Sequence, residues 1–179
     1  MKKTFEPWIG ENYQNGGKIG LRILILGEAH YGNPDEKTTD FTQRIVKKLG
    51  QEQRFAFFTK VQQLIQNRTE FIPSEDRKTF WDQVAFYNYI QDFPGKTSRI
   101  RPTKQMWEEA SPIYLETLKE LNPELVIILG NKLWDHVPYD DANTPLCGIP
   151  HPSSFGFQNA KWRDEIKAKI LELKNKKQN

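Results

Sequence analysis

The sequence predicts an α/β protein built on a parallel sheet. Two short apolar runs, at 22–27 and 125–129, are each bounded by a glycine and show no alternation of polar and apolar residues. This pattern is typical of strands buried on both faces. Segments with helical spacing separate the strand-like runs, and such alternation favours a parallel sheet flanked by helices. We therefore expect three α/β/α layers around a central four-stranded parallel sheet, in a single domain over residues 1–179.

The first half of the chain is expected to supply two strands and two helices. Residues 22–27, Arg-Ile-Leu-Ile-Leu-Gly, predict the first strand. Residues 43–66 carry apolar side chains at helical spacing, and Gly50 predicts a split into two helices. Residues 84–90, Val-Ala-Phe-Tyr-Asn-Tyr-Ile, are rich in aromatic and β-branched types and predict the second strand. Two prolines, a glycine and several basic residues at 91–102 indicate a loop.

The next segments are expected to form a helix, a strand and a short helix. Residues 103–121 have a helical pattern that contains Pro112. Either the helix kinks at this proline, or a new helix starts there with Ser111 as its N-cap. Residues 125–129, Leu-Val-Ile-Ile-Leu, predict the third strand, and a short helix through 133–134 follows.

The C-terminal region is expected to complete the sheet and cover it. Residues 146–150 predict a short last strand. A final helix places four apolar side chains on one face, namely Trp162, Ile166, Ile170 and Leu173. The lysine-rich segment 174–177 predicts a solvated, frayed tail.

Composition excludes several classes of protein. The single cysteine, Cys147, excludes an internal disulfide, a Cys-rich zinc site and a four-Cys iron–sulphur cluster. We expect a reducing compartment and a cytoplasmic protein, because neither a membrane span nor a secretory signal is evident. The three histidines lack metal-ligand spacing, so no metal or cofactor is predicted. A net charge of +3 and a pI near 8.9 permit nucleic-acid binding without demanding it.

Polar, glycine-rich and titratable residues follow the predicted strands. Ligands of parallel α/β sheets bind beyond the carboxyl ends of the strands. Four groups of residues are expected at that edge: Gly27-Glu28-Ala29-His30-Tyr31-Gly32, Asn88, Gly130-Asn131 and His151-Pro152-Ser153-Ser154.

Two motifs at this edge carry a resemblance. Gly27-Glu28-Ala29 follows a buried strand, and His151-Pro152-Ser153 lies near the C-terminus. They resemble the two signature motifs of the uracil-DNA glycosylase superfamily, and most closely those of its iron–sulphur class, which read Gly-Glu-Ala/Gly-Pro-Gly and His-Pro-Ser. Over residues 22–157, further features are similar to that class: Asn88, Pro94-Gly95, Arg101-Pro102-Thr103, the Pro-x-Tyr-Leu segment at 112–115 and Leu129-Gly130. The resemblance implies the fold of that superfamily and hydrolysis of the N-glycosidic bond of uracil, or a related deaminated base, in DNA.

The sequence also departs from that class. The cluster cysteines are absent, as in other branches of the superfamily, and His30 replaces the usual proline. Tyr31 stands where a cluster-free branch has the tyrosine of Gly-Gln-Asp-Pro-Tyr, and Ala29 stands where that branch has its water-activating aspartate. Two alternatives therefore remain open. One is a catalytically inactive DNA-binding module of the same fold, and the other is an enzyme that processes nucleosides or nucleotides.

The resemblance implies catalytic and base-reading roles for three residues. His151 would donate a hydrogen bond to uracil O2 as negative charge develops there. Asn88 would pair with uracil N3–H and O4, because a carboxamide carries an acceptor beside a donor. Glu28 would position a water or hydrogen-bond within the motif loop. The alternatives are a surface histidine that holds a turn, an asparagine that ends a strand, and a carboxylate that caps a nearby amide.

Other residues near the first motif are assigned to the base pocket. Gly27 is expected to allow close backbone approach, and Ala29 to contribute backbone only. Tyr31 would exclude the 5-methyl group of thymine by shape. Phe41 lies at the spacing where the iron–sulphur class has a phenylalanine that stacks on uracil, with core packing as the alternative.

A final set of residues is assigned to DNA. Phe155 would fill the gap left by a flipped base, unless it is buried. Ser153 and Ser154 would offer hydroxyl and backbone N–H groups to a phosphate. A basic loop would contact phosphates or remain a solvated surface; its members are Lys96, Arg99, Arg101 and Lys104. We expect a monomer that binds uracil-containing DNA, with no lyase step because no motif places a Schiff-base lysine.

Overall fold

The computed structural model describes residues 3–98 and 100–178, and within them the strands form one five-stranded sheet in the order β1-β3-β2-β4-β5. The strands are β1 (Trp8–Ile9), β2 (Ile23–Gly27), β3 (Ala85–Asn88), β4 (Leu125–Leu129) and β5 (Leu146–Ile149). Strands β2 to β5 are mutually parallel, whereas β1 pairs with β3 in the antiparallel sense. The predicted α/β class is confirmed. The predicted number of four strands is wrong, because the sheet has a fifth strand, β1. Strand β1 has only two residues, which is too short to show a pattern in the sequence.

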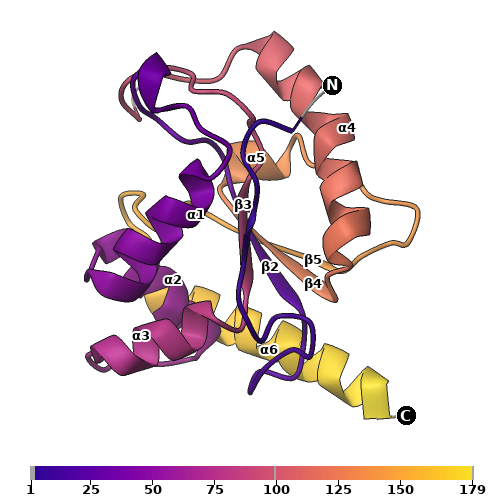
Figure 1. Ribbon diagram of the computed structural model, residues 1–179. Helices are drawn as coiled ribbons and strands as arrows, with labels where there is room; N and C mark the ends of the chain where they lie inside the picture. The colour runs from indigo at the N-terminus through magenta and orange to yellow at the C-terminus, as the bar shows by residue number, and fades with distance from the viewer. Residues whose placement is uncertain (1–2, 99, 179) are drawn as a thin grey trace.

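Helices cover both faces of the sheet (Figure 1). They are η1 (Pro34–Glu36), α1 (Phe41–Ile45), η2 (Val46–Glu52), α2 (Ala56–Ile65), α3 (Ser74–Trp81), α4 (Lys104–Leu121), α5 (Asn131–Trp134) and α6 (Asn159–Gln178). Side chains of α2, α3 and α6 pack on one face, and those of α4 and α5 pack on the other. None of the described helices is both long and apolar enough to cross a membrane.

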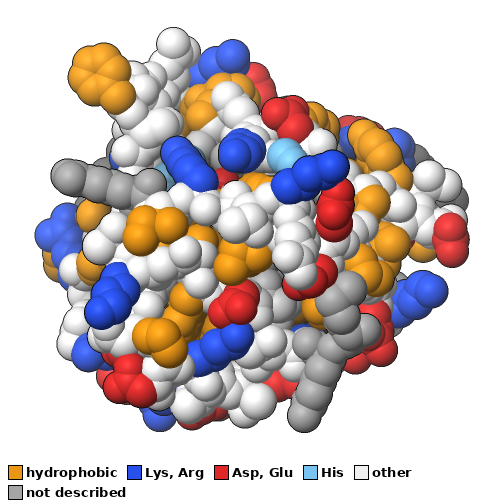
Figure 2. All heavy atoms as spheres, turned by 90° about the horizontal axis from the view of Figure 1, so that it is seen from above, with side chains coloured by type: hydrophobic (Ala, Val, Ile, Leu, Met, Phe, Trp, Pro, Cys, Tyr) orange, Lys and Arg blue, Asp and Glu red, His pale blue; other side chains and the backbone are white. Residues whose placement is uncertain are grey.

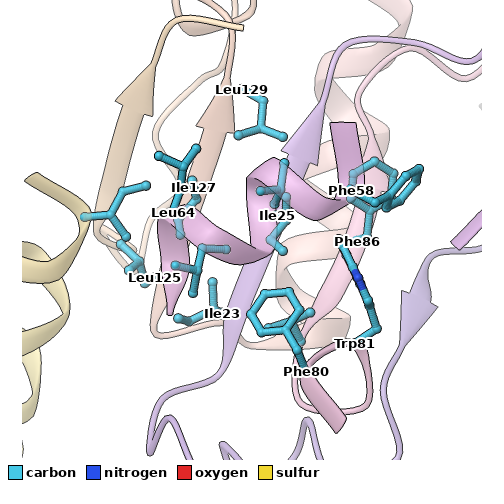
Figure 3. Close-up of a cluster of buried hydrophobic side chains, with 14 of the residues drawn as sticks. Ile23, Ile25, Phe58, Leu64, Phe80, Trp81, Phe86, Leu125, Ile127 and Leu129 are labelled. Atoms are coloured by element: carbon cyan, nitrogen blue, oxygen red, sulfur yellow. The ribbon is translucent and has the colours of Figure 1, made fainter. Parts of the chain in front are cut away.

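Each central strand is buried on both faces, which explains why its sequence does not alternate. In β2, Ile23 and Ile25 contribute to one apolar cluster, while Leu24 and Leu26 contribute to the cluster on the opposite face. Figure 3 shows the first cluster, in which strand side chains meet rings and aliphatic groups from α2, α3 and β3. Its labelled members are Ile23, Ile25, Phe58, Leu64, Phe80, Trp81, Phe86, Leu125, Ile127 and Leu129.

The helical region at 41–65 differs from its prediction. Helix α1 continues directly into η2, a π-helix, and Gly50 lies inside that π-helix instead of at a break. The break comes at 53–55, where the backbone is extended. Close packing favours glycine at this position, because a Cβ there would lie 3.1 Å from atoms of the Trp81 indole. Helix α3 was not predicted, since its mostly polar sequence hides the apolar spacing.

The C-terminal helices resolve one open alternative and correct one expectation. Helix α4 runs through Pro112, and its N-cap is Thr103, whose side chain accepts a hydrogen bond from the Met106 amide, 3.3 Å between N and Oγ1. No new helix therefore starts at Ser111. The predicted fraying of the tail is wrong, because α6 continues to Gln178 with Lys177 paired to Glu124 at 2.6 Å. The predicted exposure to solvent is confirmed for residues 175–177.

Candidate functional site

A cavity of about 820 Å³ opens at the carboxyl edge of the parallel strands. Its lining includes residues 27–31 at the end of β2, Asn88 at the end of β3, residues 129–132 around the end of β4, and residues 150, 151, 153 and 154 after β5. The volume falls in the roughly 300–1,000 Å³ range of small-molecule sites. The predicted convergence of four strand ends is therefore present. Figure 2, which views the molecule from above, shows Lys and Arg side chains interspersed with apolar ones.

The Asn88 carboxamide faces this cavity because Gly27 has no side chain. The two residues pair across β2 and β3, and a Cβ on Gly27 would overlap Asn88 Oδ1. Asn88 is 5% exposed, and no described group forms a hydrogen bond with its carboxamide. Its backbone is fixed instead, because Gln91 Nε2 donates to the Asn88 carbonyl at 2.8 Å and Gln91 Oε1 accepts from the Phe5 amide at 2.9 Å. The backbone of Asn88 is therefore fixed, and its carboxamide is free to bind a ligand.

His151 lies at the rim of the cavity, in a turn that its neighbours hold. The Ser153 amide donates to His151 Nδ1 at 3.2 Å, and the Ser154 amide donates to the His151 carbonyl at 2.8 Å. Lys60 Nζ donates to the Pro152 carbonyl at 2.7 Å. The Phe57 ring stacks on the imidazole, with centroids 5.4 Å apart and 21° between the planes. Because Nδ1 accepts, the neutral imidazole carries its proton on Nε2.

The environment of His151 favours this neutral form. Loss of hydration lowers the pKa of the imidazole below its usual value; the charge of Glu28 raises it, and Arg101 and Lys60 lower it. At neutral pH the ring is therefore a hydrogen-bond donor through Nε2 without a formal charge.

Glu28 and Arg101 form an ion pair in the wall of the cavity. Arg101 Nη1 lies 3.4 Å from Glu28 Oε1, with the carboxylate half-buried and the guanidinium exposed. The backbone of the Glu28 loop is tied to the segment after β3, because the Ile90 amide donates to the Glu28 carbonyl at 2.9 Å. Burial raises the pKa of the neighbouring Tyr31 hydroxyl; Glu28 raises it further and Arg101 opposes this. The pair thus places one carboxylate and one cation beside Asn88 and His151.

Two residues of the first motif, Ala29 and His30, line the cavity and also pack against the interior of the protein. Ala29 packs partly buried against the core cluster under α4. His30 is buried, with Nε2 2.8 Å from Thr42 Oγ1, and burial lowers its pKa to about 3. The ring of His30 meets the Phe5 and Phe41 rings edge-on.

Phe41 is not among the side chains that line the cavity. It packs with Phe5, His30 and Phe93, which corresponds to the core-packing alternative. Other phenylalanines supply the aromatic wall: Phe55, Phe57, Phe58 and Phe86. Sequence reasoning missed them because all four fall within segments whose apolar residues were assigned to helix or strand packing.

The residues assigned to DNA binding divide into three groups. Ser153, Ser154 and Arg101 line the cavity. Phe155 is fully exposed and precedes Gly156, whose φ is +71°. Arg99 lies outside the described residues, whereas Lys96 and Lys104 are exposed and absent from the cavity lining. Lys132 lines the cavity and was not predicted, because a lone lysine in a short helix carries no signal.

The arrangement suits recognition of a flat polar ring and stabilisation of developing negative charge. It combines a carboxamide, an imidazole donor, a carboxylate and cations between aromatic walls, and the described residues include no group of three or more His, Cys, Asp or Glu that could hold a metal ion. A scan of the chain against protein-family models and a search of the curated proteins both found no match.

Proposed function

We propose that the protein is a DNA glycosylase that excises uracil, or a related deaminated base, by hydrolysis of the N-glycosidic bond. One observation carries the proposal: the unpaired Asn88 carboxamide, the His151 Nε2–H donor and the Glu28 loop share one aromatic-walled cavity. The parallel strand order β3-β2-β4-β5, with helices on both faces, supports a three-layer fold like that of the uracil-DNA glycosylase superfamily. The two motifs that resemble that superfamily both border this cavity.

Asn88 reads the base in this proposal. Uracil presents an N–H donor beside a carbonyl acceptor, and the Asn88 carboxamide offers the complementary acceptor and donor. Cytosine presents the opposite pattern, so a carboxamide in the orientation that pairs with uracil leaves both groups unpaired, which is the stronger source of discrimination. The buried position of Asn88 adds to this effect, because an unpaired polar group is costly where water is excluded.

His151 stabilises the leaving group. Cleavage breaks the bond between the base nitrogen and C1′ of the sugar, and the electron pair remains on the base as an anion. The Nε2–H of His151 donates to the O2 atom that takes up this charge. Because the turn at 151–154 holds the ring before the reaction begins, little reorganisation is needed.

Glu28 positions the attacking water. Position 29 is alanine, so it offers no carboxylate, and Glu28 is the one acidic side chain among the described residues that line the cavity. The water oxygen bonds to C1′, and the proton that it releases neutralises the base anion. Arg101 orients Glu28 through their ion pair and lies where a DNA phosphate can reach its exposed side.

Residues at the rim of the cavity supply the DNA contacts in this proposal. Ser153 and Ser154 present backbone and hydroxyl groups beside His151, and both line the cavity. Phe155 projects fully exposed from the same turn, as a wedge for the gap of a flipped base would. A flipped nucleotide would place its base against Asn88 and its phosphates near these groups.

An excision assay tests the proposal against its two alternatives. Labelled oligonucleotides that contain one uracil, thymine or cytosine are incubated with the protein, then treated with alkali to break abasic sites. Alkali-sensitive breaks with uracil and not with thymine or cytosine support the glycosylase. Salt-dependent binding without any breaks supports an inactive DNA-binding module instead. Release of base from free deoxyuridine, with none from DNA, supports a nucleoside enzyme.

A further inference from the structure

Two exposed aromatic rings belong to or contact the segment 54–57, which borders the cavity. Phe55 borders the cavity and is 47% exposed, and Phe71, in the segment between α2 and α3, is 61% exposed. The Arg54 guanidinium lies over the Phe71 ring, 4.9 Å from its centroid. We call Arg54, Phe55, Phe57 and Phe71 the aromatic shelf.

Two members of the shelf, Phe55 and Phe57, are connected to His151 by ring contacts, and Phe71 joins the shelf through Arg54. The Phe55 ring lies 6.4 Å from that of Phe58, which lies 5.3 Å from that of Phe57. Phe57 in turn stacks on His151 at 5.4 Å. Isolated exposed apolar side chains are common on proteins, but exposed rings grouped beside a cavity are typical of a binding surface.

Positive charge accompanies the shelf. Arg54 lies within it, and Lys60 and Lys132 lie beside the cavity. Among the ion pairs of the described residues, none involves Arg54, Lys60 or Lys132. These cations are therefore not neutralised by a carboxylate and can contact phosphates. Aromatic rings combined with such cations are typical of surfaces that bind single-stranded nucleic acid.

We propose that the aromatic shelf stacks unpaired bases next to the target nucleotide, and that the preferred substrate is single-stranded DNA. This inference rests on the proposed function, since it assigns the strand state of the same substrate. A stacked base must offer its flat face, and in a duplex both faces are covered by neighbouring bases. The rings of Phe55 and Phe71 would then meet only sugars and phosphates.

Equilibrium binding to uracil-free oligonucleotides tests the shelf. A fluorescent single strand and the same strand in a duplex are titrated with wild-type protein, Phe55→Ala and Phe71→Ala. We expect wild type to bind the single strand more tightly than the duplex. Each substitution should weaken single-strand binding by roughly 5- to 150-fold, the usual effect of losing one stacked base, and leave duplex binding within about twofold.

Two controls separate stacking from other effects. Tyr139→Ala removes an aromatic ring that is 69% exposed and does not line the cavity, so both affinities should stay unchanged. Phe71→Trp keeps a flat ring and should retain single-strand affinity, whereas Phe71→Leu keeps apolar bulk without a flat face and should lose it. Thermal unfolding of each variant checks that the fold is intact.

Equal affinity of wild type for single strand and duplex would overturn the proposal. So would shelf variants that weaken both forms equally, or neither. If wild type excises uracil while the shelf variants keep full single-strand affinity, the shelf is wrong and the proposed function stands. If single-strand binding depends on the shelf but no base is ever released, the proposed function is wrong and the shelf stands.

Discussion

The position of the Asn88 carboxamide depends on the absence of a side chain at Gly27. A Cβ at Gly27 would overlap Asn88 Oδ1, and the carboxamide would have to turn away. We expect Gly27→Ala to lower single-turnover excision of uracil by about 100-fold, the usual effect of misplacing a reacting or recognising group by about 1 Å.

A double-variant comparison gives this prediction its control. If Gly27→Ala acts only by displacing Asn88, then adding it to Asn88→Ala should cause little further loss of excision. Additive losses would show that Gly27 acts through another group. Thermal unfolding of Gly27→Ala should change little, since the atom that must move is the end of a side chain.

The burial of His30 should make the free energy of unfolding depend on pH, independently of catalysis. Burial lowers its pKa to about 3, from an ordinary 6.5. The folded protein thus binds this proton more weakly than the unfolded chain does. The stabilisation is complete above about pH 6.5 and is lost progressively as the pH falls toward 3.

Denaturant unfolding between pH 7 and pH 4 measures this effect. We expect the free energy of unfolding of wild type to fall by about 3 kcal/mol more than that of His30→Gln, which cannot titrate in this range. Parallel curves for the two proteins would mean that His30 is not buried as a neutral ring.

Among the elements, the π-helix η2 depends on close packing between Gly50 and Trp81. A Cβ at Gly50 would lie 3.1–3.2 Å from three atoms of a fully buried indole, which has little room to move. We expect Gly50→Ala to destabilise the fold by about 1–3 kcal/mol, as overpacking does. Lys47→Ala, at an exposed position of the same helix, should change stability by less than about 0.5 kcal/mol in the same urea titration.

The elements could be predicted from the sequence where burial is complete, and not where few residues are buried or where a contact joins distant parts of the chain. Strands β2 and β4 were predicted because both of their faces are buried, so every residue is apolar. Helix α3 was missed because only three of its residues are buried within a polar sequence. The role of Gly50 was misread, since no local pattern shows that Trp81 will pack against it.

The same distinction applies to the site. The topology of a parallel sheet brings its carboxyl ends together, so the meeting of residues 27–31, Asn88 and 151–154 could be predicted. The aromatic wall could not, because the stacking of Phe57 on His151 joins two segments far apart in the chain. For the same reason Phe41 could not be distinguished from a pocket residue until its contacts with Phe5 and Phe93 were known.

At the scale of the whole molecule, DNA binding should depend on salt. In a plot of log affinity against log salt concentration, affinity falls with a slope of about −0.7 for each phosphate contact to a single strand. We expect the Arg99→Ala/Arg101→Ala double variant to bind more weakly and to reduce that slope by roughly one contact or more. Lys132→Ala, which removes another cation of the cavity lining, should also reduce it. An unchanged slope in the double variant would remove the loop after β3 from the DNA-binding face.

The most direct test of the account compares two histidines in one assay. Single-turnover excision is measured on uracil-containing DNA at saturating protein for wild type, His151→Ala and His136→Ala. His136 is exposed, stacks on Trp107 and is not part of the cavity, so it controls for loss of an imidazole. We predict a loss of about 10²–10³-fold for His151→Ala with DNA affinity retained, and a rate within about twofold of wild type for His136→Ala. The account would be contradicted if His151→Ala excised uracil at the wild-type rate, or if wild type excised no deaminated base at all.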